Sequence, residues 1–188
     1  MRSILNTSPM ALKATVFKAE LNIADLDRHY YRDHALTLAR HPSETDERMM
    51  VRLLAFALNA QDDLAFGKGL STDDEPALWQ KDLTGAIELW IDVGQPDEKD
   101  LRKACGRAQQ VIVYSYGGRT ADLWWQQNQT KLERLENLTV INLPSAATQD
   151  LAKLAQRTMQ LQCTIQDGAV WLADDNERVE INPVILKP

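Results

Sequence analysis

Two acidic residues, Glu88 and Asp92, lie in a segment whose apolar residues alternate along the chain, which predicts a strand over residues 86–93. One face carries Ile87, Leu89, Ile91 and Val93, and the other carries Trp90 between the two acids. Carboxylates on such a strand are candidate ligands for a hard cation such as Mg²⁺. Four residues at roughly 3.3 Å each place the two Cα atoms about 13 Å apart, too far for both to ligate one ion. We prefer Asp92, which lies nearer the strand end where a site opens.

The elements that position these acids follow from periodicity and turn residues. Pro96, followed by two acids, predicts a helix directly after the strand. The chain opens with a predicted β-hairpin, and Ser43 is the expected N-cap of a helix over residues 43–60. Asp167-Gly168 predicts a second hairpin in an antiparallel meander. The remaining expected elements are strands over 12–22, 29–39, 64–67, 110–116, 138–143 and 179–185, and helices over 119–130 and 145–156.

Composition limits the classes of protein that fit this chain. Its 188 residues, 44% of them hydrophobic, suit one core better than two, so we expect one domain over residues 10–188 and a loose extension over 1–9. The formal net charge of −6 gives no overall attraction for a polyanion, so nucleic acid would need a local patch or bound cations. The N-terminus lacks a signal-peptide core and no apolar run spans a membrane. We expect a cytoplasmic monomer without membrane contact.

Six segments in fixed order carry a family resemblance that covers nearly everything from Met10 onward: MALKATVFKAELNIADLDRHYY, LTLARHPSETDERMMVRLLAFAL, DDEPALW, ELWIDVGQPDE, KACGRA and IQDGAVWL. The sequence resembles the YaeQ family of bacterial proteins. The resemblance implies a compact α/β fold with two β-sheets and antiparallel hairpins, built on a variation of the PD-(D/E)XK nuclease core. It does not by itself imply an activity.

The nuclease superfamily pattern places one acid in a turn before the central strand, a second acid on that strand, and a Lys two residues later. Asp74 or Glu75, beside Pro76, matches the first acid, and Asp92 matches the second. In that pattern the acids hold Mg²⁺, and the Lys activates or orients water. Gly94 stands two residues after Asp92, so the expected Lys is missing.

Three further residues are weaker candidates. Lys103, on the following helix with Arg107, is a substitute for the missing Lys, although it lies away from the centre of that helix's apolar face. Glu88 is a candidate for a second metal or for supporting the first ligands. Glu47 shares a helical stripe with apolar residues and could add an acid; alternatively it pairs with a neighbouring Arg or stays solvated.

Three functions remain open. The first is a Mg²⁺-dependent phosphodiesterase acting on nucleic acid, with Asp74, Glu75, Asp92 and Lys103 as catalytic candidates and Glu47 and Glu88 as additional metal ligands. The alternative is a non-catalytic binding module on a nuclease fold, for nucleic acid or a protein partner. The third is a housekeeping protein whose acids are merely hydrated.

Overall fold

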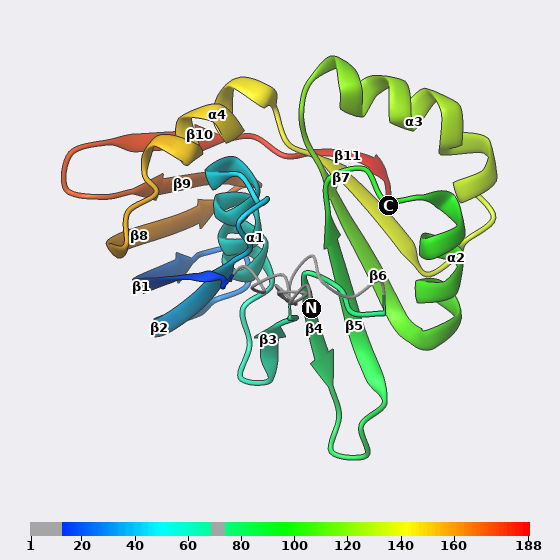
Figure 1. Ribbon diagram of the computed structural model, residues 1–188, viewed down its shortest axis with the longest axis horizontal. Coiled ribbons are helices and arrows are strands. Elements are labelled where there is room, and N and C mark those ends of the chain that lie inside the picture. The colour runs from blue at the N-terminus through cyan, green and yellow to red at the C-terminus, as the bar shows by residue number, and fades with distance from the viewer. Residues whose placement is uncertain (1–12, 69–73) are drawn as a thin grey trace, which may run out of the picture.

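The computed structural model describes residues 13–68 and 74–188, which form two mixed β-sheets and four helices (Figure 1). The predicted extension over residues 1–9 lies outside the described residues. The first sheet has the order β10-β9-β8-β1-β2. Its strands are β1 (Thr15–Asp25), β2 (Tyr30–Arg40), β8 (Thr158–Gln166), β9 (Ala169–Ala173) and β10 (Arg178–Ile181). β1 and β8 run parallel, and the other neighbours are antiparallel.

The second sheet has the order β11-β7-β6-β5-β4-β3, and β5–β6–β7 run parallel. Its strands are β3 (Leu64–Phe66), β4 (Leu78–Lys81), β5 (Ile87–Val93), β6 (Ala108–Ser115), β7 (Leu138–Asn142) and β11 (Val184–Lys187). The helices are α1 (Asp46–Asn59), α2 (Glu98–Arg107), α3 (Arg119–Leu132) and α4 (Ser145–Lys153). No helix among the described residues is long and apolar enough to cross a membrane.

The layers alternate between sheets and helices (Figure 1). A large core joins the inner faces of both sheets through α1 and α4, whereas a smaller core joins the other face of the second sheet to α2 and α3. The sheets therefore belong to one α/β domain. Every residue from Met49 to Ala57 is buried, because α1 lies between the two sheets and has almost no solvent face beyond its first turn.

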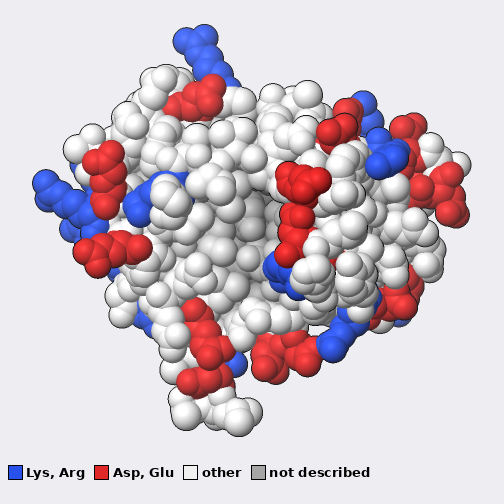
Figure 2. Space-filling model, turned by 180° about the vertical axis from the view of Figure 1, so that it is seen from behind, with Lys and Arg blue, Asp and Glu red and all other residues white. Residues whose placement is uncertain are grey.

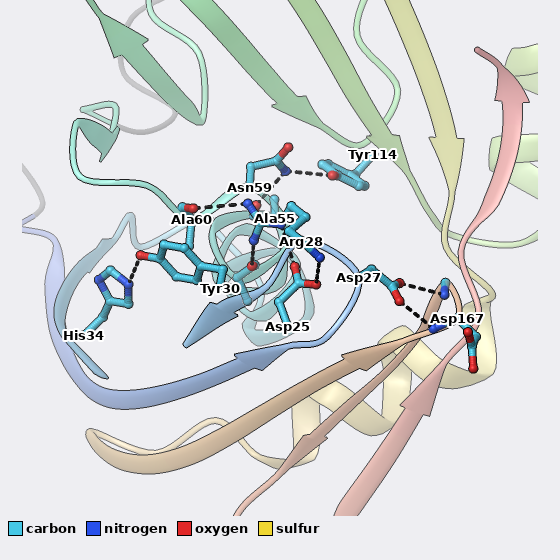
Figure 3. Close-up of polar contacts among 12 residues, drawn as sticks. Asp25, Asp27, Arg28, Tyr30, His34, Ala55, Asn59, Ala60, Tyr114 and Asp167 are labelled. Atoms are coloured by element: carbon cyan, nitrogen blue, oxygen red, sulfur yellow. Dashed lines mark hydrogen bonds and ion pairs between the residues drawn. The ribbon is translucent and has the colours of Figure 1, made fainter. Parts of the chain in front are cut away.

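A polar network fixes the end of α1 between the sheets (Figure 3). Arg28, in the β1–β2 turn, pairs with Asp25 at 2.5 Å and donates to the carbonyl oxygens of Ala57 (3.2 Å) and Ala60 (3.1 Å). These bonds satisfy carbonyl groups that a helix end leaves free, and they place a cation at the favourable end of the helix dipole. From the other side, Asn59 donates to the hydroxyl of Tyr114 on β6 at 2.7 Å.

Several predicted local details differ from the structure. Thr45, not Ser43, is the N-cap of α1, and its hydroxyl accepts a hydrogen bond of 3.1 Å from the backbone N–H of Arg48. Helix α2 begins at Glu98, with Asp97 as the N-cap, rather than at Pro96. The predicted strand over 179–185 is two strands: β10 completes the meander, and the chain crosses at Asn182-Pro183 into β11, which pairs with β7 of the other sheet.

Candidate functional site

A cleft of about 700 Å³ lies between α2 and the segment that leads into β4, beside the end of β5. Four predicted site residues, Asp74, Glu75, Asp92 and Lys103, line it. The rest of its wall is Arg48, Pro76, Ala77, Trp90, Val93, Pro96, Asp100, Arg102, Ala104, Gly106 and Arg107. The cleft therefore brings together acids and bases from α1, α2, β5 and residues 74–77.

Asp92 enters the cleft from β5, between the neighbouring strands β4 and β6. Its Oδ2 accepts a hydrogen bond of 2.8 Å from the indole Nε1 of Trp90, and its carboxylate also accepts from the backbone N–H of Ala77. Burial raises the pKa of the Asp92 carboxyl, and this effect outweighs the two hydrogen bonds and the nearby charge of Arg48, which lower it. The desolvated carboxylate would gain from a cation placed beside it.

The segment with Asp74 and Glu75 is held at the cleft by contacts on both sides. Gly67 donates from its backbone N–H to the carbonyl oxygen of Ala77 at 2.9 Å. A Cβ atom on Gly67 would collide with the carbonyl oxygen of Pro76, so only glycine permits this close approach. On the α2 side, Arg107 Nη1 donates to the carbonyl oxygen of Asp74 at 3.2 Å.

Glu75 is already bound within this segment. Its Oε2 accepts a hydrogen bond of 3.0 Å from the backbone N–H of Lys68, and its Oε1 lies 3.7 Å from Lys68 Nζ. Within residues 13–68 and 74–188, the Asp74 carboxylate makes no such contact. Within these described residues, Glu75 is therefore the more firmly held of the two acids.

Lys103 projects from α2 and is largely solvated. Its side chain is 78% exposed, and its Nζ lies 3.8 Å from the carboxylate of Asp100. Arg107 is more closely integrated, because its guanidinium also lies over the ring of Trp90, 5.2 Å from the centroid. An exposed Lys103 that is paired with Asp100 can attract an anion but is poorly placed to orient a single water.

Glu88 and Glu47 lie outside the lining of the cleft. A β-bulge between β4 and β5 interrupts the alternation at Glu88, whose carboxylate accepts a hydrogen bond of 2.7 Å from Gln80 Nε2. Because of this bulge, Ile87 packs with the α2–α3 core instead of sharing the Leu89 face. Glu47 accepts a hydrogen bond of 2.7 Å from the hydroxyl of Thr148 on α4, rather than pairing with Arg40 or Arg48.

Arg48 is a cleft residue that sequence reasoning missed. Its side chain is 19% exposed, lines the cleft, and donates to Glu44 Oε1 at 2.6 Å. Glu44 is also paired with the fully buried Arg52. The sequence did contain evidence that could have identified Arg48. Arg48 and Arg52 are four residues apart within a largely apolar stretch of helix, and buried arginines need an acidic partner or a ligand.

The charge around the cleft is mixed. Its wall holds both acidic and basic residues. Figure 2 shows acidic and basic side chains interspersed over one face of the molecule, without a large basic area there. Within the described part of the chain, no three His, Cys, Asp or Glu side chains converge as a ready metal site. The acids therefore do not fit an all-protein cage. A Mg²⁺ ion that is held by one or two carboxylates and completed by water and phosphate oxygens needs fewer protein ligands than such a cage.

Comparisons with known proteins agree on one family. The model of the YaeQ protein family matches residues 10–183. The chain is 50% identical over 173 residues to "Uncharacterized protein YaeQ" of Escherichia coli (strain K12), covering 92% of this chain and 96% of that protein. The relative of the same name in Salmonella typhi is 51% identical over 172 residues, covering 92% and 95%.

Solved structures agree with the sequence comparisons. The crystal structure of YaeQ protein from Xanthomonas axonopodis pv. citri has a TM-score of 0.90 and 53% identity, covering 93% of this chain and 98% of that chain. The YaeQ protein from Pseudomonas syringae has a TM-score of 0.89 and 39% identity, covering 93% and 97%. Since sequence and fold match over nearly the whole length, this protein belongs to the YaeQ family.

Proposed function

We propose that the cleft between α2 and residues 74–77 is a Mg²⁺-dependent phosphodiesterase site that acts on nucleic acid in the cytoplasm. One observation carries this proposal: Asp74 and Glu75 line the same cleft as Asp92, although eighteen residues separate Asp74 from Asp92 in the sequence. The resemblance to the PD-(D/E)XK nuclease pattern supports the same assignment, because that pattern places its two acids at these positions.

The roles follow from the contacts of each residue. Asp92 and Asp74 would hold the ion, with Glu75 available once Lys68 releases it. When bound, Mg²⁺ would neutralise the phosphate charge and lower the pKa of a bound water. Trp90 and Ala77 orient the Asp92 carboxylate, whereas Lys103 and Arg107 add positive charge along α2.

A second function, a non-catalytic binding module, is favoured by the bonds that the acids already make. The Asp92 carboxylate accepts from Trp90 and Ala77, and Glu75 accepts from Lys68, so part of their capacity is used within the protein. Such a module would hold a nucleic acid or a protein partner in the same cleft without cleaving it.

Cleavage assays with matched variants separate these functions. End-labelled single-stranded DNA, duplex DNA and RNA would be incubated with the protein in Mg²⁺, Mn²⁺ or EDTA. A phosphodiesterase cleaves at least one substrate only with metal and loses the activity in Asp92→Asn, but keeps it in Asp150→Asn, a change to an exposed acid on α4. Binding without metal-dependent cleavage supports a nucleic-acid-binding module. If the protein neither binds nor cleaves any of these nucleic acids, the phosphodiesterase and the nucleic-acid-binding module are both contradicted, and only a module for a protein partner remains.

A further inference from the structure

Two arginines share one buried carboxylate next to the cleft. Arg52 bonds to both oxygens of Glu44, with Nε 2.7 Å from Oε1 and Nη2 2.8 Å from Oε2. Arg48 adds a third bond, from Nη1 to Oε1 at 2.6 Å. The Glu44 and Arg52 side chains are each 1% exposed, so this pairing is shielded from water.

These three side chains carry a net positive charge. Arginine stays protonated in proteins, so two guanidinium groups and one carboxylate leave one positive charge uncompensated. Arg52 already neutralises Glu44 through a bidentate pair, and it is enclosed. The excess charge therefore belongs to Arg48, the more exposed of the two.

The location of Arg48 favours the binding of an anion. Arg48 lies in the first turn of α1, where the helix dipole disfavours a cation. In the part of the chain that the structure describes, the Nε and Nη2 atoms of Arg48 form no hydrogen bond. Neither atom is both buried and without a partner, so both are open to solvent or a ligand. Arg48 lines the cleft together with Asp92 and Val93, at the end of β5.

We infer that Arg48 binds a phosphate group of the cleft's ligand, with Glu44 and Arg52 holding its guanidinium in place. The open nitrogens of a guanidinium match the oxygens of a phosphate. Asp92 lines the same cleft, so a cation bound to Asp92 would contact the same phosphate under the proposed function. Arg48 thereby supplies the fixed positive charge that the strand lacks at Gly94. This inference rests on the proposed function for the identity of the ligand, but phosphate binding is measurable without cleavage.

The test measures binding in EDTA, where cleavage does not interfere. Fluorescein-labelled dT oligonucleotide of about ten nucleotides and inorganic phosphate would be titrated separately, by anisotropy and by the NMR signal of the Arg48 Nε–H. Arg48→Gln should weaken oligonucleotide binding about 10- to 100-fold, as expected for loss of a charge-assisted hydrogen bond. It should also lower the salt dependence by about one phosphate contact.

The matched control is Arg32→Gln, which removes a charge from a side chain that is 51% exposed, paired with Asp62 and outside the lining of the cleft. It should leave binding within about twofold of wild type, because an exposed charge away from the cleft contributes little. Arg48→Lys should restore part of the affinity, and melting curves show whether each variant is folded. A shift of the Arg48 signal with inorganic phosphate alone identifies a general phosphate site, and a shift with oligonucleotide only identifies a nucleic-acid site.

The inference is overturned if Arg48→Gln binds the oligonucleotide as tightly as wild type, even when cleavage assays support the phosphodiesterase. It is also overturned if neither probe moves the Arg48 signal in the wild-type protein. Metal-dependent cleavage that persists alongside either result would leave the proposed function standing.

Discussion

The indole Nε1 of Trp90 donates a hydrogen bond of 2.8 Å to Oδ2 of Asp92. The two residues are two positions apart on β5 and therefore share one face of the strand, as the alternation of the sequence predicted. Trp90 is buried against α2 and α3, so its ring has a fixed place in the core. The core of the protein thus sets the orientation of the candidate metal ligand.

Trp90→Phe tests this coupling, because it removes the donor while keeping an aromatic ring. We expect a lower free energy of unfolding and a further rise in the pKa of Asp92. A double-mutant cycle with Asp92→Ala, which removes the acceptor, is measured by urea denaturation and cancels the cost of the smaller ring. The coupling energy should be about 1 kcal/mol. Additive effects of the two changes would show that the hydrogen bond contributes nothing.

Gly67→Ala should displace the segment that carries Asp74 and Glu75, because the added methyl group collides with Pro76. The expected loss in the free energy of unfolding is about 1 to 3 kcal/mol, as for other overpacked sites. Gly106→Ala is the control in α2, since a methyl group there meets nothing within 4 Å. That change should stabilise the protein by up to about 1 kcal/mol, because alanine favours a helix. Equal effects at the two positions would refute the close approach at Gly67.

Arg52→Met should destabilise the protein by about 3 to 5 kcal/mol in urea denaturation, because the buried Glu44 would lose its bidentate partner. The comparison is Arg102→Met, which breaks an exposed pair with Glu98 and should cost less than about 1 kcal/mol. If Arg52→Met costs no more than the exposed change, Arg52 does not neutralise Glu44.

The surroundings of His34 predict that the free energy of unfolding depends on pH. Burial lowers the pKa of its imidazole below 6.5, with a further contribution from the charge of Arg32. A histidine whose folded pKa is lowered contributes stability that is present above its unfolded pKa, and this stability is lost as pH falls through the folded pKa. The NMR titration of His34 should have its midpoint below 6.5. His34→Gln should flatten the fall in unfolding free energy as pH drops below about 6.5; an unchanged pH profile would exclude this contribution.

Strand alternation and turn residues were sufficient to predict much of the fold. The alternation placed Trp90 and Asp92 on one face, and Asp167-Gly168 forms the predicted hairpin turn, with both residues at positive φ. The bulge at Glu88 was not predictable, because it depends on the pairing register with β4 rather than on the residues of β5 alone. The crossing of the chain from β10 in the first sheet to β11 in the second was likewise not predictable, because it depends on which sheet has an unpaired edge strand in the folded protein.

The resemblance to the nuclease pattern, and not the periodicity of any one element, predicted which acids from separate segments face one cleft. Asp74, Glu75, Asp92 and Lys103 line one cleft, whereas Glu47 and Glu88 found polar partners elsewhere. Arg48 could not be placed from its helical stripe, because α1 is enclosed by both sheets and its polar first turn meets β5 only in the folded molecule.

Thermal melts with and without Mg²⁺ test most directly whether Asp92 helps to hold a metal ion. A ligand that binds only the folded state raises the midpoint, by about 2.7 kcal/mol of stability at one hundred times its Kd. Mg²⁺ should raise the midpoint of wild type and of the surface control Asp150→Asn, but not that of Asp92→Asn. Without metal, Asp92→Asn should melt at or above the wild-type midpoint, because it removes a desolvated charge. Equal responses to Mg²⁺ in all three proteins would contradict a metal site at Asp92.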